Sequence, residues 1–243
     1  MSRKRIDKLV HERGLTDSRE AARRSILAGK VKAGGHVVDK PGTQVAEDVE
    51  IEVAQPPRYV GRGGLKLERA LEEFALPVDG AVCLDIGSST GGFTDCLLQH
   101  GAAKVHAVDV GTNQLAWKIR SDPRVAVQEN FNARYLKEED LGEHVDLAVI
   151  DVSFISLRLI LPPAFGVLKP DGGIVCLIKP QFELTRELVG KGGIVRDPAL
   201  HAQAVDTIRR FVVEDLRKHW HNVIDSPITG ADGNREFLAW LKH

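Results

Sequence analysis

Two lysines and two carboxylates are the residues whose types best suit chemistry: Lys66, Asp151, Lys179 and Glu236. A buried lysine beside a second cation has a pKa below the usual value of about 10.4, so it can take a proton from a hydroxyl group or orient that group's lone pair. We expect Lys179 to have this role, with Asp151 and Glu236 holding its ammonium group and Lys66 positioning the acceptor. A structural cluster of ion pairs would explain any one of these residues. It does not explain all four at positions that one sheet edge brings together.

A glycine-rich turn follows a buried strand in Val82-Cys83-Leu84-Asp85-Ile86-Gly87-Ser88-Ser89-Thr90-Gly91-Gly92-Phe93. Glycines let a ligand approach the backbone at the carboxyl edge of a parallel sheet. A dinucleotide-binding turn starting at Gly87 would need glycine in place of Ser89, and the Gly-Lys-Ser/Thr of a phosphate-binding loop is absent. A carboxylate before the first glycine suits an amino group and a sulfonium cation, the features of S-adenosylmethionine. The predicted cofactor-binding residues of this turn are Asp85, Gly87, Ser88, Gly91, Gly92 and Phe93.

Further cofactor contacts are predicted where the following strands end. Asp109 comes 24 residues after Asp85, where a carboxylate can accept hydrogen bonds from both ribose hydroxyls. After the third strand, Asn130 or Asn132 could contact the adenine, and Asp151 also borders this edge. With a methyl donor in place, a ribose 2'-hydroxyl that attacks the sulfonium methyl group must lose its proton. This is the task that we expect Lys179 to support.

Alternating apolar runs and helical patterns predict the elements that position these residues. The strands are expected at residues 81–85, 104–109, 125–128, 146–151, 173–178, 221–224 and 236–240, and the helices at 64–74, 93–100, after Ser156 and at 199–218. Successive β-α units of this kind form a parallel sheet covered by helices. The predicted fold class is α/β, with a Rossmann-like, seven-stranded sheet. If the last strand is antiparallel, Glu236 lies at the same edge as Asp151 and Lys179.

A smaller α+β module precedes this domain. Ile6, Leu9 and Val10 predict one short helix; Thr16 or Asp17, followed by Glu20, starts a second that Gly29 ends. Short strands are expected at Val31 and at residues 36–38 and 49–53. The segment Gln55-Pro56-Pro57-Arg58 is typical of a stiff linker, since proline disfavours both helix and central strand. The predicted domains are therefore residues 1–57 and residues 58–243.

The first module is strongly basic, because residues 1–32 contain ten lysines or arginines against four aspartates or glutamates. Charge of this density on a short folded segment suits contact with nucleic-acid phosphates, although such a run is commonly just a solvated helix face. The predicted RNA-binding residues are Arg3, Lys4, Arg5, Lys8, Arg19, Arg23, Arg24, Lys30, Lys32 and, beyond the linker, Arg62.

Composition favours a cytoplasmic protein. The longest nearly apolar stretch, residues 159–168, is half of a membrane span and contains two prolines, and charged Asp7 and Lys8 stand where a signal peptide needs apolar residues. The three cysteines are widely spaced in apolar surroundings, so they indicate neither a disulfide framework nor a metal site.

These residues together resemble a known family. Lys66, Asp151, Lys179 and Glu236 match the Lys-Asp-Lys-Glu tetrad of the FtsJ-like RNA ribose 2'-O-methyltransferases, and the first module resembles an S4 RNA-binding domain. The combination, with Tyr59-Val60-Gly61-Arg62-Gly63-Gly64-Leu65-Lys66-Leu67, Asp151-Val152-Ser153-Phe154-Ile155-Ser156 and Ile178-Lys179-Pro180-Gln181-Phe182-Glu183, is similar to the TlyA or hemolysin-A family over essentially the whole chain. One departure is Gly61, where the family pattern has a serine before Arg-Gly.

The resemblance implies a function. It implies methyl transfer from S-adenosylmethionine to a cytidine ribose of ribosomal RNA or of a ribosomal subunit, and the length of the chain favours the large subunit alone. The alternatives are a membrane-active hemolysin, which no amphipathic or spanning segment supports, and a non-catalytic RNA-binding protein, against which the complete tetrad speaks. A pseudouridine synthase, another enzyme class that carries S4 modules, would not need the glycine-rich turn.

Overall fold

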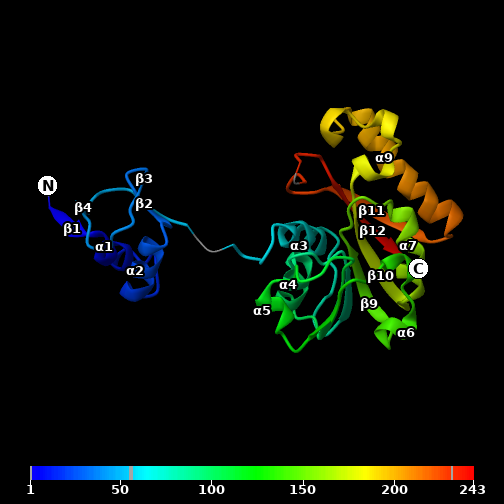
Figure 1. Ribbon diagram of the computed structural model, residues 1–243, viewed down its shortest axis with the longest axis horizontal. Coiled ribbons are helices and arrows are strands. Elements are labelled where there is room, and N and C mark those ends of the chain that lie inside the picture. The colour runs from blue at the N-terminus through cyan, green and yellow to red at the C-terminus, as the bar shows by residue number, and fades with distance from the viewer. Residues whose placement is uncertain (1, 55–56, 231) are drawn as a thin grey trace. The chain divides into compact units, whose positions relative to one another are not determined.

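A computed structural model describes residues 2–54, 57–230 and 232–243. The chain divides into two compact units, residues 1–57 and residues 58–243 (Figure 1). Within the segment predicted to be a linker, Gln55 and Pro56 lie outside the described residues.

The first unit packs two helices against short strands. Its elements are β1 (Arg3–Arg5), α1 (Ile6–Glu12), α2 (Arg19–Leu27), β2 (Val31–Ala33), β3 (His36–Val37), β4 (Gln44–Ala46) and β5 (Ile51–Val53). β1 pairs with β4, and β2 lies between β3 and β5, with all pairs antiparallel. The buried core contains Ile6 and Val10 from α1, Ala22 and Ile26 from α2, and Val31. The two predicted helices are therefore present, and their apolar faces form the core.

Two details of this unit differ from the sequence prediction. The second helix does not begin at Thr16 or Asp17, because Ser18 is its N-cap and accepts a hydrogen bond from the backbone N–H of Ala21. The strands β1 and β4 are absent from the prediction. Each has three residues without an alternating apolar pattern, so neither gives a recognisable strand signal.

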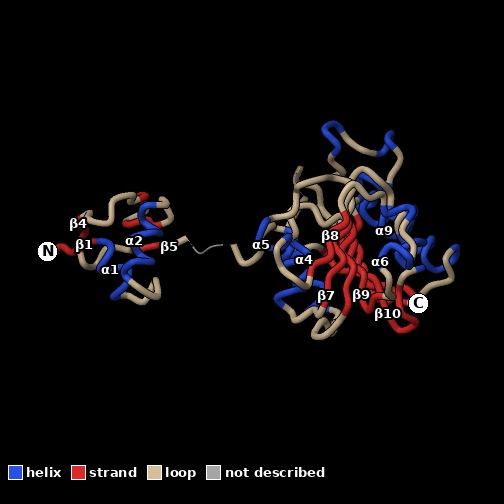
Figure 2. Tube along the Cα trace, turned by 60° about the horizontal axis from the view of Figure 1, so that its bottom comes forward, coloured by secondary structure: helices blue, strands red, loops and turns tan. Residues whose placement is uncertain are grey.

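The second unit is built on a central sheet (Figure 2), and its described strands follow the order β11-β12-β10-β9-β6-β7-β8. The strands are β6 (Val82–Ile86), β7 (Lys104–Val108), β8 (Val125–Gln128), β9 (Val145–Ile150), β10 (Leu168–Ile178), β11 (His219–Asp225) and β12 (Phe237–Lys242). β12 runs antiparallel to β10 and β11, and the other pairs are parallel. This confirms the predicted Rossmann-like architecture, and the reversed last strand meets the condition under which Glu236 lies at the same edge as Asp151 and Lys179.

Helices cover both faces of this sheet. They are α3 (Gly63–Glu73), α4 (Gly92–Gln99), α5 (Trp117–Arg120), α6 (Glu138–Leu141), α7 (Leu161–Gly166), α8 (Pro180–Glu183) and α9 (Pro198–Arg210), which continues as a π-helical turn (Phe211–Asp215). Successive residues of a strand face opposite sides, so Cys83 packs with α3 and α4 while Leu84 packs with α7 and α9. The sheet is thus buried on both faces, which explains its nearly continuous apolar strands.

Three strands stop or start one residue away from a predicted site residue that the sequence analysis placed inside the strand. Asp109 and Asp151 follow β7 and β9, and Glu236 precedes β12, so these side chains lie in loops at the sheet edge. β10 also begins earlier than predicted, at Leu168, with a register shift before Gly173. In the described parts of the chain, no helix has the length and apolar character needed to cross a bilayer.

Candidate active site

The carboxyl edge of the sheet brings the predicted tetrad together. Asp151 and Lys179 follow the neighbouring parallel strands β9 and β10, whose ends lie side by side. Because β12 is antiparallel and Phe237 pairs with Ile178, Glu236 reaches the same edge. Lys66 comes from α3, which packs beside α4. All four residues line one cavity of about 410 Å³.

The tetrad consists of two separate ion pairs. Nζ of Lys66 donates to Oε2 of Glu236 at 2.5 Å, and their side chains are 9% and 3% exposed. Nζ of Lys179 lies 2.6 Å from Oδ1 of Asp151 and donates to Oγ of Ser153 at 2.9 Å. The prediction that Glu236 holds Lys179 is therefore wrong. Glu236 is occupied by Lys66, because α3 presents that lysine directly to the loop before β12.

A second cavity, of about 450 Å³, lies beside the first and shares part of its wall. Asp109, Phe131, Asn132 and Ile160 line it, so it combines one carboxylate and one amide with apolar surface. Gly87, Ser89, Asp151, Ser153 and Phe154 line both cavities. The two adjoining cavities could hold two different molecules with their reacting groups next to Asp151.

The glycine-rich turn lines both cavities through Gly87 and Ser89. Gly87 has a φ of 86°, and a Cβ at this position would lie 2.3 Å from the backbone oxygen of Asp151. Only glycine permits this close approach of the two loops. Gly87, Ser88, Gly92 and Phe93 line the first cavity, whereas Gly91, with a φ of 94°, turns the chain into α4 and lines neither cavity.

Asp85 also lies away from both cavities. It is fully buried, and its Oδ2 accepts a 2.6 Å hydrogen bond from the hydroxyl of Thr94 on α4. Burial raises the pKa of Asp85 to about 7, against the lowering effect of the Thr94 hydrogen bond. The position of Asp85 therefore supports a role in tying β6 to the start of α4 beneath the turn.

Asp109 is held in the second cavity by the backbone. Its two carboxylate oxygens accept hydrogen bonds from the N–H groups of Ser89 and Gly111, each at 2.7 Å. Each oxygen keeps a further lone pair for a ligand. Of the two asparagines, Asn132 lines this cavity and Asn130 does not. The position therefore favours Asn132 for the predicted adenine contact.

Two aromatic residues, Phe154 and Phe182, line the first cavity together with Lys179 but are not among the predicted site residues. Phe154 is 90% exposed, lines both cavities, and has a φ of 63°, which is unusual for a residue other than glycine. Its ring lies 5.1 Å from that of Phe182, which lines the first cavity. The sequence places Phe154 in a loop after a strand but carries no signal for its backbone conformation or exposure.

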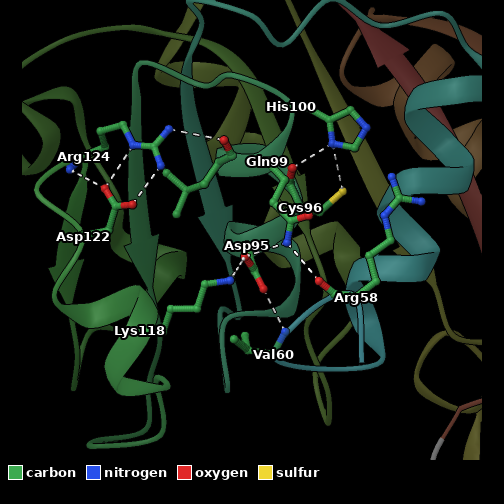
Figure 3. A network of polar contacts seen from close by, with 10 residues as sticks. Arg58, Val60, Asp95, Cys96, Gln99, His100, Lys118, Asp122 and Arg124 are labelled. Atoms are coloured by element: carbon green, nitrogen blue, oxygen red, sulfur yellow. Dashed lines mark hydrogen bonds and ion pairs between the residues drawn. The ribbon is translucent and has the colours of Figure 1, made fainter. Parts of the chain in front are cut away.

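The segment that leads into this unit is fixed by Asp95 on α4. Figure 3 shows this buried carboxylate accepting hydrogen bonds from the Val60 N–H at 2.8 Å, the Gln99 amide at 3.0 Å and the Lys118 ammonium at 3.1 Å. Gly61 follows, and a Cβ there would lie 2.6 Å from Oγ1 of Thr90. A side chain at this position would therefore require Thr90 to move. Arg62 then lines the first cavity.

In the first unit, the predicted RNA-binding cations divide into two groups. Arg5 and Arg19 both pair with buried Asp7, and Lys4 pairs with Glu12 at 2.6 Å. Lys32 lies 3.9 Å from Glu52. Among the described residues, no acidic side chain forms an ion pair with the remaining cations of this set, Arg3, Lys8, Arg23, Arg24 and Lys30, all of which are exposed.

The reversed last strand, the glycine-rich turn and the paired cavities define a methyltransferase of the Rossmann-like class. A family model described as FtsJ-like methyltransferase matches residues 59–243, and one described as S4 domain matches residues 4–51. The chain belongs to the FtsJ-like methyltransferase family.

Similar proteins extend over both units. The 16S/23S rRNA (cytidine-2'-O)-methyltransferase TlyA of Mycobacterium tuberculosis is 47% identical over 99% of this chain and 90% of that protein. Hemolysin A of Brachyspira hyodysenteriae is 45% identical over 97% of this chain and 98% of its own length. The solved structure of a hemolysin-type protein from Streptococcus thermophilus is 46% identical, covers 99% of this chain and 88% of that one, and superposes with a TM-score of 0.75.

The protein is therefore an S-adenosylmethionine-dependent methyltransferase, and its second cavity fits this cofactor. Asp109 presents free lone pairs suited to ribose hydroxyls, and Phe131 and Ile160 supply apolar wall for an adenine. Gly87 lines both cavities at the point where its loop approaches the Asp151 backbone. When bound, the cofactor supplies an electrophilic methyl group.

Proposed function

We propose that the protein methylates the 2'-hydroxyl of a cytidine ribose in ribosomal RNA. The observation that carries this proposal is the placement of Lys179, paired with Asp151 and Ser153, in the cavity that adjoins the cofactor-sized one. An ammonium group has three N–H donors. One donates to Ser153, and the ion pair with Asp151 holds the group in place, which leaves N–H donors for the oxygen of an acceptor hydroxyl.

The two ion pairs have different tasks in this reaction. The ion pair with Asp151 at 2.6 Å holds the Lys179 ammonium group in the cavity, where it orients the acceptor oxygen by donating to one of its lone pairs. Lys66, held by Glu236, presents a second cation to the ribose and its phosphate in the same cavity. The hydroxyl is thus aligned for attack, and its proton passes to solvent as the oxygen–methyl bond forms and the sulfonium–methyl bond breaks. Asp151 and Glu236 keep both lysines in place.

Phe154 and Arg62 complete the acceptor site. The exposed Phe154 ring offers a stacking surface for the base of an unpaired nucleotide, and proteins commonly read such bases in this way. Arg62 lines the same cavity and can bind a flanking phosphate. The exposed cations of the first unit supply affinity for the RNA backbone that does not depend on sequence.

The proposed substrate is cytidine in the large ribosomal subunit, modified in the cytoplasm. The similarity to the M. tuberculosis enzyme, named for both 16S and 23S RNA, supports ribosomal RNA as the substrate class. The similarity to the Campylobacter jejuni protein named 23S rRNA (cytidine-2'-O)-methyltransferase TlyA supports the large subunit.

Mapping ribose methylation on ribosomal RNA tests the proposal. Purified wild-type protein and Lys179→Ala are incubated with S-adenosylmethionine and with isolated large and small subunits, and methylated riboses are located by their resistance to alkaline cleavage. We expect one protected cytidine in large-subunit RNA with the wild type and none with the variant. Methylation of a base, or of no ribose, would contradict the proposed activity, and methylation of small-subunit RNA would contradict the subunit assignment.

A further inference from the structure

Two loops meet directly behind the proposed acceptor site. One is residues 151–157, which follows β9, and the other is residues 179–183, which consists of Lys179 and α8. They touch at both ends. At one end Lys179 contacts Asp151 and Ser153, and at the other Glu183 contacts Ser156 and Leu157.

Glu183 uses both carboxylate oxygens to hold the first loop. Oε2 accepts a hydrogen bond from the Ser156 hydroxyl at 2.6 Å, and Oε1 accepts one from the Leu157 N–H at 2.9 Å. The side chain is buried, with the residue 7% exposed. Burial raises the pKa of Glu183, and the Leu157 and Ser156 hydrogen bonds and the charge of Arg158 oppose that rise. The tetrad does not include this residue, and it reaches the loop from the opposite end to Lys179.

The loop that Glu183 holds is strained at its most exposed residue. Phe154 has a φ of 63°, a conformation that costs free energy for any residue with a Cβ and persists only where neighbouring contacts impose it. Phe154 contacts Phe182 through a single ring pair at 5.1 Å. The remaining contacts that hold the strained backbone are therefore the hydrogen bonds of Ser153 with Lys179 and of Ser156 and Leu157 with Glu183. Ser156 is itself oriented, because its oxygen accepts hydrogen bonds from Arg158.

We propose that Glu183 is a positioning residue that keeps Ser153 and Phe154 in their places beside Lys179. It acts through the loop: its carboxylate fixes residues 156 and 157, and the segment between them and Asp151 then has too little freedom to relax the strained backbone. This inference rests on the proposed function, since it assigns a catalytic consequence to the loop position.

The test compares Glu183→Ala and Glu183→Gln with Glu187→Ala, a matched control at an exposed glutamate four residues further along the chain. Because a displacement of about 1 Å can cost on the order of 100-fold in rate, we expect Glu183→Ala to lower the single-turnover rate of methyl transfer about 100-fold. Its affinities for S-adenosylmethionine and RNA should stay within about twofold of the wild type, since the residue touches neither proposed ligand site. Glu183→Gln should restore part of the rate, because its amide oxygen can still accept from Leu157.

A second measurement reads the loop without any substrate. Hydrogen exchange followed by mass spectrometry should show faster exchange of residues 151–157 in Glu183→Ala than in the wild type or in Glu187→Ala. Ser156→Ala removes one hydrogen bond and leaves the Glu183 carboxylate, so exchange in this loop should become faster by a smaller amount. This variant provides the test if Glu183→Ala does not fold. Unchanged exchange in both loop variants, or a normal single-turnover rate in Glu183→Ala, would overturn the proposal. If the wild type methylates no ribose while the loop responds as expected, the proposed function fails and the structural role of Glu183 stands.

Discussion

Nζ of Lys66 lies 2.5 Å from Oε2 of Glu236, although 170 residues separate them in the chain. This contact joins α3 to the loop before β12 across the end of β10, and both partners are almost fully buried. Because Glu236 is already paired with Lys66, the other lysine of the cavity, Lys179, has Asp151 and Ser153 as its partners. The two cations therefore differ in their surroundings and, we infer, in their tasks.

Removing one member of the buried Lys66–Glu236 pair should destabilise the protein more than removing both. Glu236→Leu leaves a buried, unpaired ammonium group and is expected to lower the free energy of unfolding by about 3 kcal/mol. The double variant Lys66→Met/Glu236→Leu should recover much of this loss, because no buried charge remains. Urea unfolding of the single and double variants measures the difference. A double variant less stable than Glu236→Leu would show that the unpaired Lys66 ammonium group is not what destabilises the single variant.

Lys179 should affect the chemical step far more than ligand binding. Lys179→Ala is expected to lower the single-turnover rate by about 10²- to 10⁴-fold while binding of S-adenosylmethionine and RNA persists. Lys179→Arg separates the two roles considered for this residue, because a guanidinium group keeps the charge but does not act as a base near neutral pH. The geometry favours orientation of the acceptor oxygen, so the arginine variant should retain more activity than the alanine variant. Equal loss in both variants would instead favour proton abstraction.

The positions of the strands in the second unit could be predicted from the sequence, because each buried strand is an apolar run bounded by turn residues. The convergence of Asp151 and Lys179 follows from parallel neighbouring strands, whereas that of Glu236 required in addition that the last strand be antiparallel. The pairing of Glu236 with Lys66 does not, because it depends on which lysine α3 presents to the β12 loop, a matter of side-chain packing. The left-handed backbone of Phe154 is likewise invisible in the sequence, since contacts made by the folded loops impose it.

Asp109 should contribute cofactor affinity without contributing to the fold of the sheet. We expect Asp109→Ala to weaken S-adenosylmethionine binding by about 10- to 100-fold, which corresponds to the loss of hydrogen bonds to a charged group. Isothermal titration calorimetry measures the affinity, and Glu139→Ala, at an exposed carboxylate on α6, is the matched control. If both variants bound the cofactor like the wild type, the ribose contact would have to be assigned elsewhere.

The unpaired cations of the first unit should set the salt dependence of RNA binding. Replacing Lys8, Arg23 and Arg24 together with glutamine is expected to weaken binding and to reduce the slope of log K against log salt by up to about 0.7 to 0.9 for each phosphate that is no longer neutralised. Lys4→Gln is the comparison, because Lys4 is already paired with Glu12 and should matter less. Filter binding at several salt concentrations gives both slopes. A triple variant with the wild-type slope would place the RNA-binding surface on other residues.

Asp7 should stabilise the first unit in a pH-dependent way. Burial raises the pKa of this carboxyl, but hydrogen bonds and charges from Arg5 and Arg19 outweigh burial and lower the pKa from 3.8 to about 2. The folded state thus favours the ionised form by about 2 kcal/mol, a contribution present above pH 3.8 and lost as the pH falls towards 2. Asp7→Asn should remove this contribution at neutral pH, as thermal unfolding of this unit would show. Exposed Asp17→Asn should leave the midpoint unchanged.

At Phe154, the residue that would best stabilise the backbone differs from the residue that would best serve the proposed reaction. A glycine at this position would adopt the φ of 63° without the steric cost that phenylalanine bears. Phenylalanine at this position therefore lowers the stability of the fold, and it favours the reaction if its ring stacks on a base of the RNA. Selection for heat resistance alone would favour losing the ring at this position, and selection for methylation would retain it. Residue 154 is accordingly the place where a more stable and less active form of this enzyme should first arise.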